Sequence, residues 1–392
     1  MGKGAHMDAA GWAPGQGADR EGRAACRAHN FSAGPAMLDT GAMTYVQENL
    51  LDYEGCGMGI HEMSHRDVGG PVHEMMARTS DNVRRLLGVP DNYRILFFQG
   101  GAHGQFAAVP LNLFGKGGKG DYVIGGNWST KAMKEASKYG EVRVVEDTTS
   151  KGNAYYAPVD EWELSDDSAY VHVCTNETVQ GLAMHEDPDV GPNHVLAADM
   201  TSSLFSRPVD VRKYGVIYAS GGKNLGPAGC CLVIVRDDLL DQSLPQTPSI
   251  LSWKVANDHN CLYYTPNAFA IWCVGVITGD LLARYGNLEE VAKRSKQRAE
   301  MVYKVIDNSV GFYTNNVRPD FRSHTAIPFR IRDGVEELEK KFIRDSVKCG
   351  LHQTFGHSSV GGLRVAIYNG LPDESLKEFV KFMKDFMDTN AE

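Results

Sequence analysis

The sequence predicts an α/β protein in which a large domain, built on a mainly parallel sheet, precedes a smaller α+β domain. Strand-like runs alternate with helix-like runs from about residue 90, as they do when helices cover a parallel sheet. Most of these strands are apolar throughout, which is typical of strands buried on both faces. After about residue 286 the pattern changes to long amphipathic helices separated by short strands.

The elements of the large domain, residues 46–285, follow in order along the chain. The run 93–99 (YRILFFQ) predicts a strand that stops at Gly100, and 105–114 predicts a helix. The next elements are a strand at 121–125, a helix at 130–139, a strand at 142–145, and strands in the runs that start at residues 169, 194, 215 and 230. Ligands bind beyond the carboxyl ends of such strands, so we expect the chemistry there.

The small domain is expected over residues 286–392. Helices are predicted at 287–306, 335–349 and 375–387, and strands at 326–331 and 363–368. Asp333 is positioned to cap the second helix and Gly350 to end it.

Charge and cysteine spacing exclude several classes of function. The 392 residues include 40 Lys or Arg and 49 Asp or Glu, so the net charge is −9. Nucleic acids and anionic membranes need basic surface, so neither is expected as a partner. No apolar run approaches the roughly 20 residues of a membrane span. The eight cysteines show no CxxC spacing, which predicts free thiols in a reducing compartment.

Residues 1–28 differ from the rest of the chain. They are rich in Gly, Ala and charge, without periodicity and without the apolar stretch of a secretory signal. We expect a disordered leader, either an expression leader or the remnant of a targeting segment. The protein is therefore expected in the cytoplasm, or in an organelle if residues 1–28 derive from a transit peptide. Residues 29–45 are expected to pack with the small domain.

Unusual residues follow three of the predicted strands. In the turn 100–106 (GGAHGQF) glycines admit a ligand to the backbone, and the helix start offers free N–H groups to an anion; a plain tight turn is the alternative. Trp128 follows strand 121–125 and either fills the core or stacks on a planar ring. Thr178 follows the strand from residue 169, and its hydroxyl either bonds a ligand oxygen or closes a turn.

Two charged residues also lie at the ends of predicted strands. Asp199 ends a buried strand, where an acid needs a partner such as a cationic pyridinium nitrogen or an Arg. Lys223 lies in a Gly-rich turn between two apolar strands, where partial desolvation lowers its pKa and favours Schiff-base chemistry; a plain surface-loop lysine is the alternative. Together the five features suit a planar, phosphorylated, nitrogen-containing cofactor that reacts with an amine.

Several motifs recur together in one known family. They are NFSAGPA from Asn30, SHR from Ser64, GGAHGQFAAVPLN from Gly100, NWS from Asn127, NETVQG from Asn176, ADMTS from Ala198, GGKN from Gly221 and VGGLRVAIYN from Val360. With them the chain resembles the phosphoserine aminotransferase family, in class V of the fold-type-I enzymes that use pyridoxal 5'-phosphate (PLP). The resemblance implies a seven-stranded sheet and a homodimer with active sites at the subunit interface.

By match of motif, the resemblance implies a role for each residue that contacts the cofactor. Lys223 would bind PLP covalently and act as general base and acid, and Asp199 would pair with the pyridine nitrogen. Trp128 would stack on the cofactor ring, and the hydroxyl of Thr178 would bond the ring oxygen. The cofactor phosphate would be contacted by Ala102, by His103 and by Thr265 of the neighbouring subunit. No metal is implied.

The implied reaction transfers the amino group of L-glutamate to 3-phosphohydroxypyruvate and gives O-phospho-L-serine and 2-oxoglutarate, a step of serine biosynthesis. Arg364 would bind the substrate carboxylate, and His65, Arg66 and His357 would form the pocket for the substrate phosphate. The main alternative is another class V transaminase that acts on an unphosphorylated amino acid such as serine. A non-catalytic relative and a dinucleotide-binding oxidoreductase are disfavoured, because Lys223 is retained and GGAHGQF lacks the GxGxxG spacing.

Four positions depart from the pattern of the family. Gly222 and Tyr264 stand where Gln and Asn are usual, which removes small polar contacts to the cofactor. His103 stands where Arg is frequent, and Ser358 replaces the Arg that usually follows His357. A charge-assisted contact to a phosphate is worth roughly 1.5–3 kcal/mol, so we expect a weakened or rearranged phosphate site.

Overall fold

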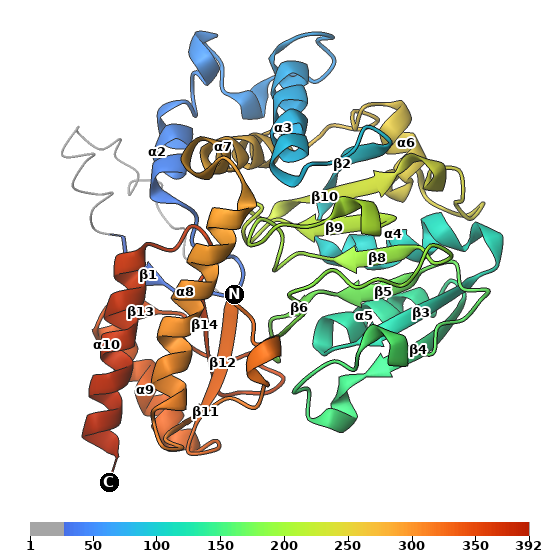
Figure 1. Ribbon diagram of the computed structural model, residues 1–392. Helices are drawn as coiled ribbons and strands as arrows, with labels where there is room; N and C mark the ends of the chain where they lie inside the picture. The colour runs from blue at the N-terminus through green and yellow to red at the C-terminus, as the bar shows by residue number, and fades with distance from the viewer. Residues whose placement is uncertain (1–26, 392) are drawn as a thin grey trace, which may run out of the picture.

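The large domain is built on a seven-stranded sheet in the order β2-β10-β9-β8-β5-β3-β4 (Figure 1). Strand β10 runs antiparallel to both of its neighbours and the other six strands run parallel, which confirms the predicted α/β architecture. The strands are β2 (Tyr93–Gly100), β3 (Lys119–Ile124), β4 (Glu141–Asp147), β5 (Val171–Cys174), β8 (Leu196–Asp199), β9 (Val216–Ser220) and β10 (Gly229–Arg236). The computed structural model describes residues 27–391, so nearly all of the predicted leader, 1–28, lies outside the described residues.

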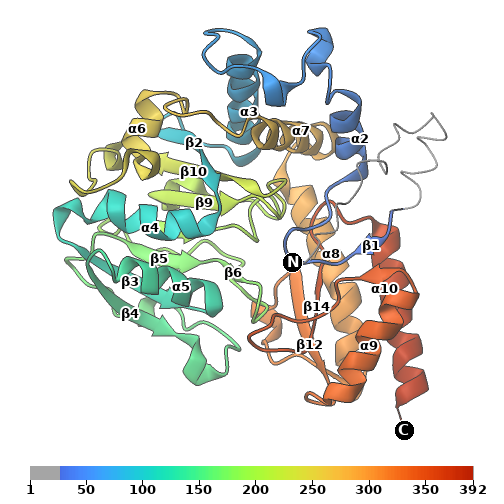
Figure 2. The same cartoon turned by 180° about the vertical axis from the view of Figure 1, so that it is seen from behind.

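Helices cover the sheet and its β2 edge. Figure 2 shows α4 (Ala102–Leu113) and α5 (Asn127–Ala136) in front of the sheet. At the other end, α7 (Ala268–Tyr285) packs beside α2 (Thr40–Glu48), α3 (Pro71–Leu87) and β10, while α6 (Trp253–Asp258) packs on β2. Within residues 27–391, α7 is long and apolar enough to cross a membrane by length and composition, but Ile271, Trp272 and Val274 lie in the protein core.

The small domain has a three-stranded antiparallel sheet in the order β11-β12-β14, at the lower left of Figure 1. A short parallel pair joins β1 (His29–Asn30) to β13 (Leu351–His352), and Phe31 and Met37 lie in the small-domain core. Ala42 and Val46 of α2 lie instead in the large-domain core. The remaining elements are β6 (Asn176–Glu177), β7 (Leu182–Ala183), α8 (Leu288–Asp307), β11 (Tyr313–Thr314), β12 (Ala326–Ile331), α9 (Glu336–Lys348), β14 (Leu363–Ala366) and α10 (Asp373–Asn390).

Three local predictions were wrong, each for an identifiable reason. The helices expected at 105–114 and 130–139 begin three residues earlier, because Gly101 and Gly126 take the cap positions. Strand β4 lies at the sheet edge and exposes most of its side chains, so it is not buried on both faces. Asp333 does not cap α9: its φ of 55° places it in a turn before the helix, and Val335 stands at the cap without a side-chain bond.

The thiol prediction holds over the described chain. All seven cysteines within residues 27–391 are free, and five of them are buried. The eighth, Cys26, lies outside the described residues.

Candidate active site

A cavity of about 360 Å³ opens at the carboxyl ends of β2, β3, β5, β8 and β9. Its volume falls within the range of roughly 300–1,000 Å³ that is usual for small-molecule sites. Eight of the residues predicted from sequence line it: Ala102, His103, Trp128, Thr178, Asp199, Lys223, His357 and Arg364. The parallel strands bring these residues together because their carboxyl ends meet at one edge of the sheet.

Lys223 lies in the turn between β9 and β10. Gly222, directly before it, has a φ of 97°, a conformation that glycine adopts without strain, so the Gln usual at this position would be unfavourable in this backbone. The amide of Ala36 donates to the carbonyl of Gly222 at 2.8 Å, which fastens the N-terminal segment over the turn. Burial lowers the pKa of Lys223, and Arg364 lowers it further, while Asp199 opposes both. The amine is therefore biased toward the neutral form that attacks a carbonyl.

Asp199 ends β8 with its carboxylate in the cavity. One carboxylate oxygen accepts a hydrogen bond from the amide of Thr201 at 2.8 Å. Burial raises the pKa of Asp199, while the bonds from Thr201 and the charge of Lys223 lower it. A cationic ring nitrogen beside this carboxylate would favour its ionised form.

Trp128 lies in the first turn of α5, close to Lys223. The lysine Nζ is 5.8 Å from the centre of the indole ring, and the indole Nε1 donates to Thr178 Oγ1 at 2.9 Å. Because Thr178 Oγ1 accepts this bond, its own proton is available for an oxygen in the cavity.

Glu177 holds this arrangement and was missed by the sequence reasoning. Its side chain is fully buried, and its two oxygens accept bonds from the amide of Trp128 at 2.9 Å and from the amide and hydroxyl of Ser129 at 2.7 and 2.6 Å. Glu177 thus takes the place of a side-chain cap at the start of α5 and fixes both Trp128 and its own neighbour Thr178. The acid lies inside the quoted motif NETVQG, between apolar runs, which is the signal that could have identified it.

We expect Glu177→Gln to weaken the cavity wall at Trp128 and Thr178. An amide has one accepting oxygen for three donors, so the variant should lose about 1–3 kcal/mol of unfolding free energy and should retain the cofactor less well. The measurements are the urea midpoint and the cofactor left after dialysis, with Glu161→Gln, an exposed residue, as the matched control. Equal stability and equal cofactor retention in the two variants would contradict this role.

The start of α4 offers a site for an anion. The helix has no side-chain cap, and Gly100, with a φ of 96°, turns the chain so that Ala102 and His103 open the helix at the cavity. Free N–H groups and the helix dipole at this end favour a phosphate group.

The small domain contributes Arg364 and His357. Arg364 lies on β14 and donates to the carbonyl of Thr178 at 3.1 Å, so it bridges the two domains over the cavity. Burial lowers the pKa of His357, as do Arg364 and Lys131. Lys131 lies on α5 with its Nζ 4.6 Å from the centre of the Trp128 ring; it was missed by the sequence reasoning.

Three predicted residues lie elsewhere on the large domain. His65 and Thr265 line a separate cavity of about 120 Å³, and Arg66 is exposed nearby in sequence. The side-chain amide of Gln99, at the end of β2, donates to the carbonyl of Thr265 at 2.6 Å. The backbone amide of Gln99 donates to the hydroxyl of Tyr264 at 3.3 Å. Tyr264, which stands where Asn is usual in the family, therefore supports the end of β2 through its hydroxyl.

An amine, an acid, an aromatic ring, a hydroxyl and an uncapped helix start face one cavity on a mainly parallel sheet. This set defines an enzyme of the kind that works on amines through a planar, phosphorylated ring. The family model described as Aminotransferase class-V matches residues 28–379, and the chain belongs to this family.

Solved structures give the same result. The chain is similar to the phosphoserine aminotransferase from Bacillus circulans subsp. alkalophilus, with 39% identity, a TM-score of 0.88, and coverage of 93% of this chain and 99% of that one. It is also similar to the PLP-bound phosphoserine aminotransferase from Trichomonas vaginalis, with 34% identity, a TM-score of 0.85, and coverage of 91% and 100%. An alanine–glyoxylate aminotransferase from Nostoc sp. shares the fold at 14% identity, with a TM-score of 0.69 and coverage of 92% and 95%. The predicted fold type I is confirmed.

Proposed function

We propose that this protein is a PLP-dependent aminotransferase that transfers the amino group of L-glutamate to 3-phosphohydroxypyruvate and serves serine biosynthesis. The observation that carries the proposal is the convergence of Lys223, Asp199 and Trp128 in one cavity beneath Arg364. The relatives at 34–39% identity, which are phosphoserine aminotransferases, support the substrate pair. Direct assay of glutamate formation from phosphoserine and 2-oxoglutarate, beside a serine–glyoxylate assay, tests it.

The residues of the cavity fit PLP. The free start of α4 at Ala102 and His103 suits the phosphate, Trp128 suits the ring face, and Asp199 suits the ring nitrogen. Bound PLP supplies the electron sink that makes removal of the substrate Cα proton feasible.

Lys223 and Arg364 carry the steps that fall to the protein. Arg364 holds the substrate carboxylate, because a guanidinium matches that group with two hydrogen bonds. This fixes the Cα hydrogen within reach of Lys223, whose neutral amine, favoured by the pKa that burial lowers, takes the proton and later returns it. Asp199 stabilises positive charge on the ring nitrogen throughout.

The alternative substrate class, an unphosphorylated amino acid, is favoured by Ser358. This residue is exposed in the loop after His357, where an Arg would bind a phosphate. Besides Arg364, which is assigned to the substrate carboxylate, Lys131 is a cation close enough to His357 to lower its pKa. We propose that Lys131 and His357 contact the substrate phosphate together with Arg66.

We expect Ser358→Arg to lower the KM for phosphoserine about tenfold and to leave the KM for glutamate nearly unchanged. The reason is a new charge-assisted contact to the substrate phosphate, worth about 1.5–3 kcal/mol. Steady-state kinetics of both substrates provide the measurement, with Ser358→Gln as the uncharged control. If Arg and Gln variants behave alike, the phosphate does not bind at this loop and the alternative gains support.

We further propose a homodimer in which His65, Arg66 and Thr265 complete the cavity of the neighbouring subunit. The support is their position: all three match family motifs, yet they do not line the cavity of their own chain. In a shared site, His65 and Arg66 would contact the substrate phosphate of the neighbouring subunit, and Thr265 would contact its cofactor phosphate.

Mixing two inactive variants tests the shared site. Lys223→Ala and Arg66→Ala are each expected to be severely impaired with phosphoserine, but a mixed dimer contains one cavity with both Lys223 and Arg66 intact. Random exchange of subunits should therefore restore roughly a quarter of wild-type activity, since half of the dimers are mixed and half of their sites are complete. Activity in the mixture that only averages the two variants would exclude a shared site.

A further inference from the structure

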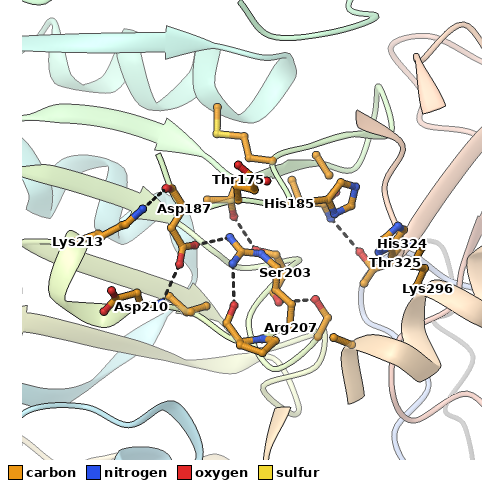
Figure 3. A pocket seen from close by; sticks show the side chains of 18 of the residues that line it. Thr175, His185, Asp187, Ser203, Arg207, Asp210, Lys213, Lys296, His324 and Thr325 are labelled. Carbon is orange, nitrogen blue, oxygen red and sulfur yellow. Dashed lines mark hydrogen bonds and ion pairs between the residues drawn. The ribbon is translucent and has the colours of Figure 1, made fainter. Parts of the chain in front are cut away.

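A second cavity, of about 1300 Å³, lies between the two domains and shares Asn176 with the candidate active site. The large domain contributes loops that follow β5 and β8, and the small domain contributes α8 and the segment before β12 (Figure 3). No residue to which we assign a catalytic or cofactor role lines it. The labelled lining residues are Thr175, His185, Asp187, Ser203, Arg207, Asp210, Lys213, Lys296, His324 and Thr325.

Two of the four acids that line this cavity, Asp187 and Asp210, are already engaged within the protein. Asp187 forms an ion pair with Arg207 at 2.7 Å (Figure 3). It also accepts bonds from the hydroxyl of Tyr214 at 2.8 Å and from the backbone amide of Asp210 at 2.7 Å. Asp210 in turn pairs with Arg212 at 2.8 Å. These carboxylates therefore have little capacity left for a cationic ligand.

The basic groups, by contrast, are incompletely satisfied. His185 and His324 stack with ring centres 4.1 Å apart. His185 Nε2 bonds to the carbonyl of Arg322 at 2.9 Å, whereas the ring of His324 has no hydrogen-bond partner within residues 27–391. Lys296 is exposed at the cavity and forms no ion pair with a carboxylate among residues 27–391. The buried Nε of Arg207 has no hydrogen-bond partner within the same residues. Burial lowers the pKa of both histidines, and the positive charge of Lys296 lowers both further.

We propose that this cavity is a second binding site, for a small oxyanion held between Lys296 and the stacked pair of His185 and His324. An oxyanion at this position is attracted by Lys296 and accepts a hydrogen bond from the ring N–H of His324. Phosphate esters and carboxylates share this chemistry. The site is a product of the domain interface, because Lys296 and His324 come from the small domain and His185 and Arg207 from the large one.

Hydrogen bonds in the wall between the two cavities connect this second binding site to the candidate active site. Asn176 donates to the hydroxyl of Thr325 at 2.9 Å, and that hydroxyl donates to the carbonyl of Ser202 at 2.9 Å. Thr325 directly follows His324, and Asn176 lies two residues before Thr178. A bound oxyanion would fasten the segment 324–325 to the large domain beside the residues that line the candidate active site.

Calorimetric titration of the holoenzyme with sodium sulfate, at constant ionic strength set with sodium chloride, tests the proposal. Sulfate keeps its double charge at neutral pH, and any binding in the active site is common to the proteins compared. We compare wild type with Lys296→Ala and His324→Phe, which remove the charge and the ring donor while keeping the helix and the stacked ring. Lys304→Ala, an exposed lysine in the last turn of the same helix, is the matched control.

Wild type and Lys304→Ala should bind one sulfate per chain at the second cavity. The Lys296→Ala and His324→Phe variants should bind this sulfate about tenfold more weakly or not at all. Transaminase kcat without sulfate should be the same in Lys296→Ala as in wild type. Displacement of that sulfate by succinate would assign the site to carboxylates, and resistance to succinate would assign it to phosphate esters. Identical isotherms in all four proteins would overturn the proposal.

Discussion

Lys223→Ala is expected to lower transaminase turnover by roughly four orders of magnitude or more, because the variant loses both the covalent bond to the cofactor and the general base. Among the described residues that line the cavity, Lys223 is the one lysine, while Lys131 lies outside that lining with its Nζ 4.6 Å from the centre of the Trp128 ring. Single-turnover kinetics with glutamate provide the measurement, since they isolate proton transfer from cofactor loss. Lys254→Ala, an exposed lysine on α6, should keep full activity.

Added amines test the role of Lys223 as general base separately from its role in binding the cofactor. If it is the base, small primary amines added to Lys223→Ala should raise the rate in proportion to their concentration, because they supply the missing proton acceptor. Turnover in Lys223→Ala within tenfold of wild type would contradict both roles.

Asp199→Asn is expected to lower kcat by about 10²- to 10³-fold, the usual cost of removing one preorganised electrostatic contact in an active site. Asn keeps the shape of the side chain and can still accept the bond from the Thr201 amide, so the cavity should remain intact. What the variant lacks is the negative charge that holds a proton on the ring nitrogen.

Steady-state kcat, with absorbance to show that the cofactor is retained, measures this effect. Asp187→Asn is the matched control, since Asp187 is also a hydrogen-bonded acid of the large domain but lines the second cavity and not the candidate active site. If Asp199→Asn and Asp187→Asn reduce kcat equally, the effect of Asp199 is structural and its assigned role is wrong.

The sequence predicts the sheet and the strand-end residues because both follow from local patterns. Apolar runs bounded by Gly and polar residues mark the strands, and parallel strands place their carboxyl ends together. Trp128, Asp199 and Lys223 therefore meet in one cavity, although they are separated by up to 95 residues between 128 and 223.

Other features depend on contacts that no local pattern encodes. Glu177 fulfils its role by capping α5, which begins 50 residues earlier, so the pairing is visible only when β5 and α5 are packed. The contact of Arg364 with the carbonyl of Thr178 depends on how the small domain sits over the sheet. The stacked histidines of the second cavity likewise come from different domains, 139 positions apart between 185 and 324.

The starts of two helices, α4 and α5, were also misplaced for a physical reason. Glycine is a weak helix former, so the run Gly100-Gly101 and the motif GGN before Trp128 were assigned to loops. In the structure the glycines end the loops, and Ala102, His103 and Trp128 already lie in first helical turns. The shift places Ala102 and His103 themselves in the first turn of the helix whose free N–H groups were expected to face an anion.

Whether Lys223 binds PLP is tested most directly by borohydride reduction of the purified protein with PLP, followed by peptide mass spectrometry. We predict a yellow protein whose colour is lost on reduction, with the mass of reduced pyridoxyl phosphate fixed on the peptide that contains Lys223 and absent in Lys223→Ala. A protein that stays colourless in excess PLP, or a label fixed on a different lysine, would contradict the account.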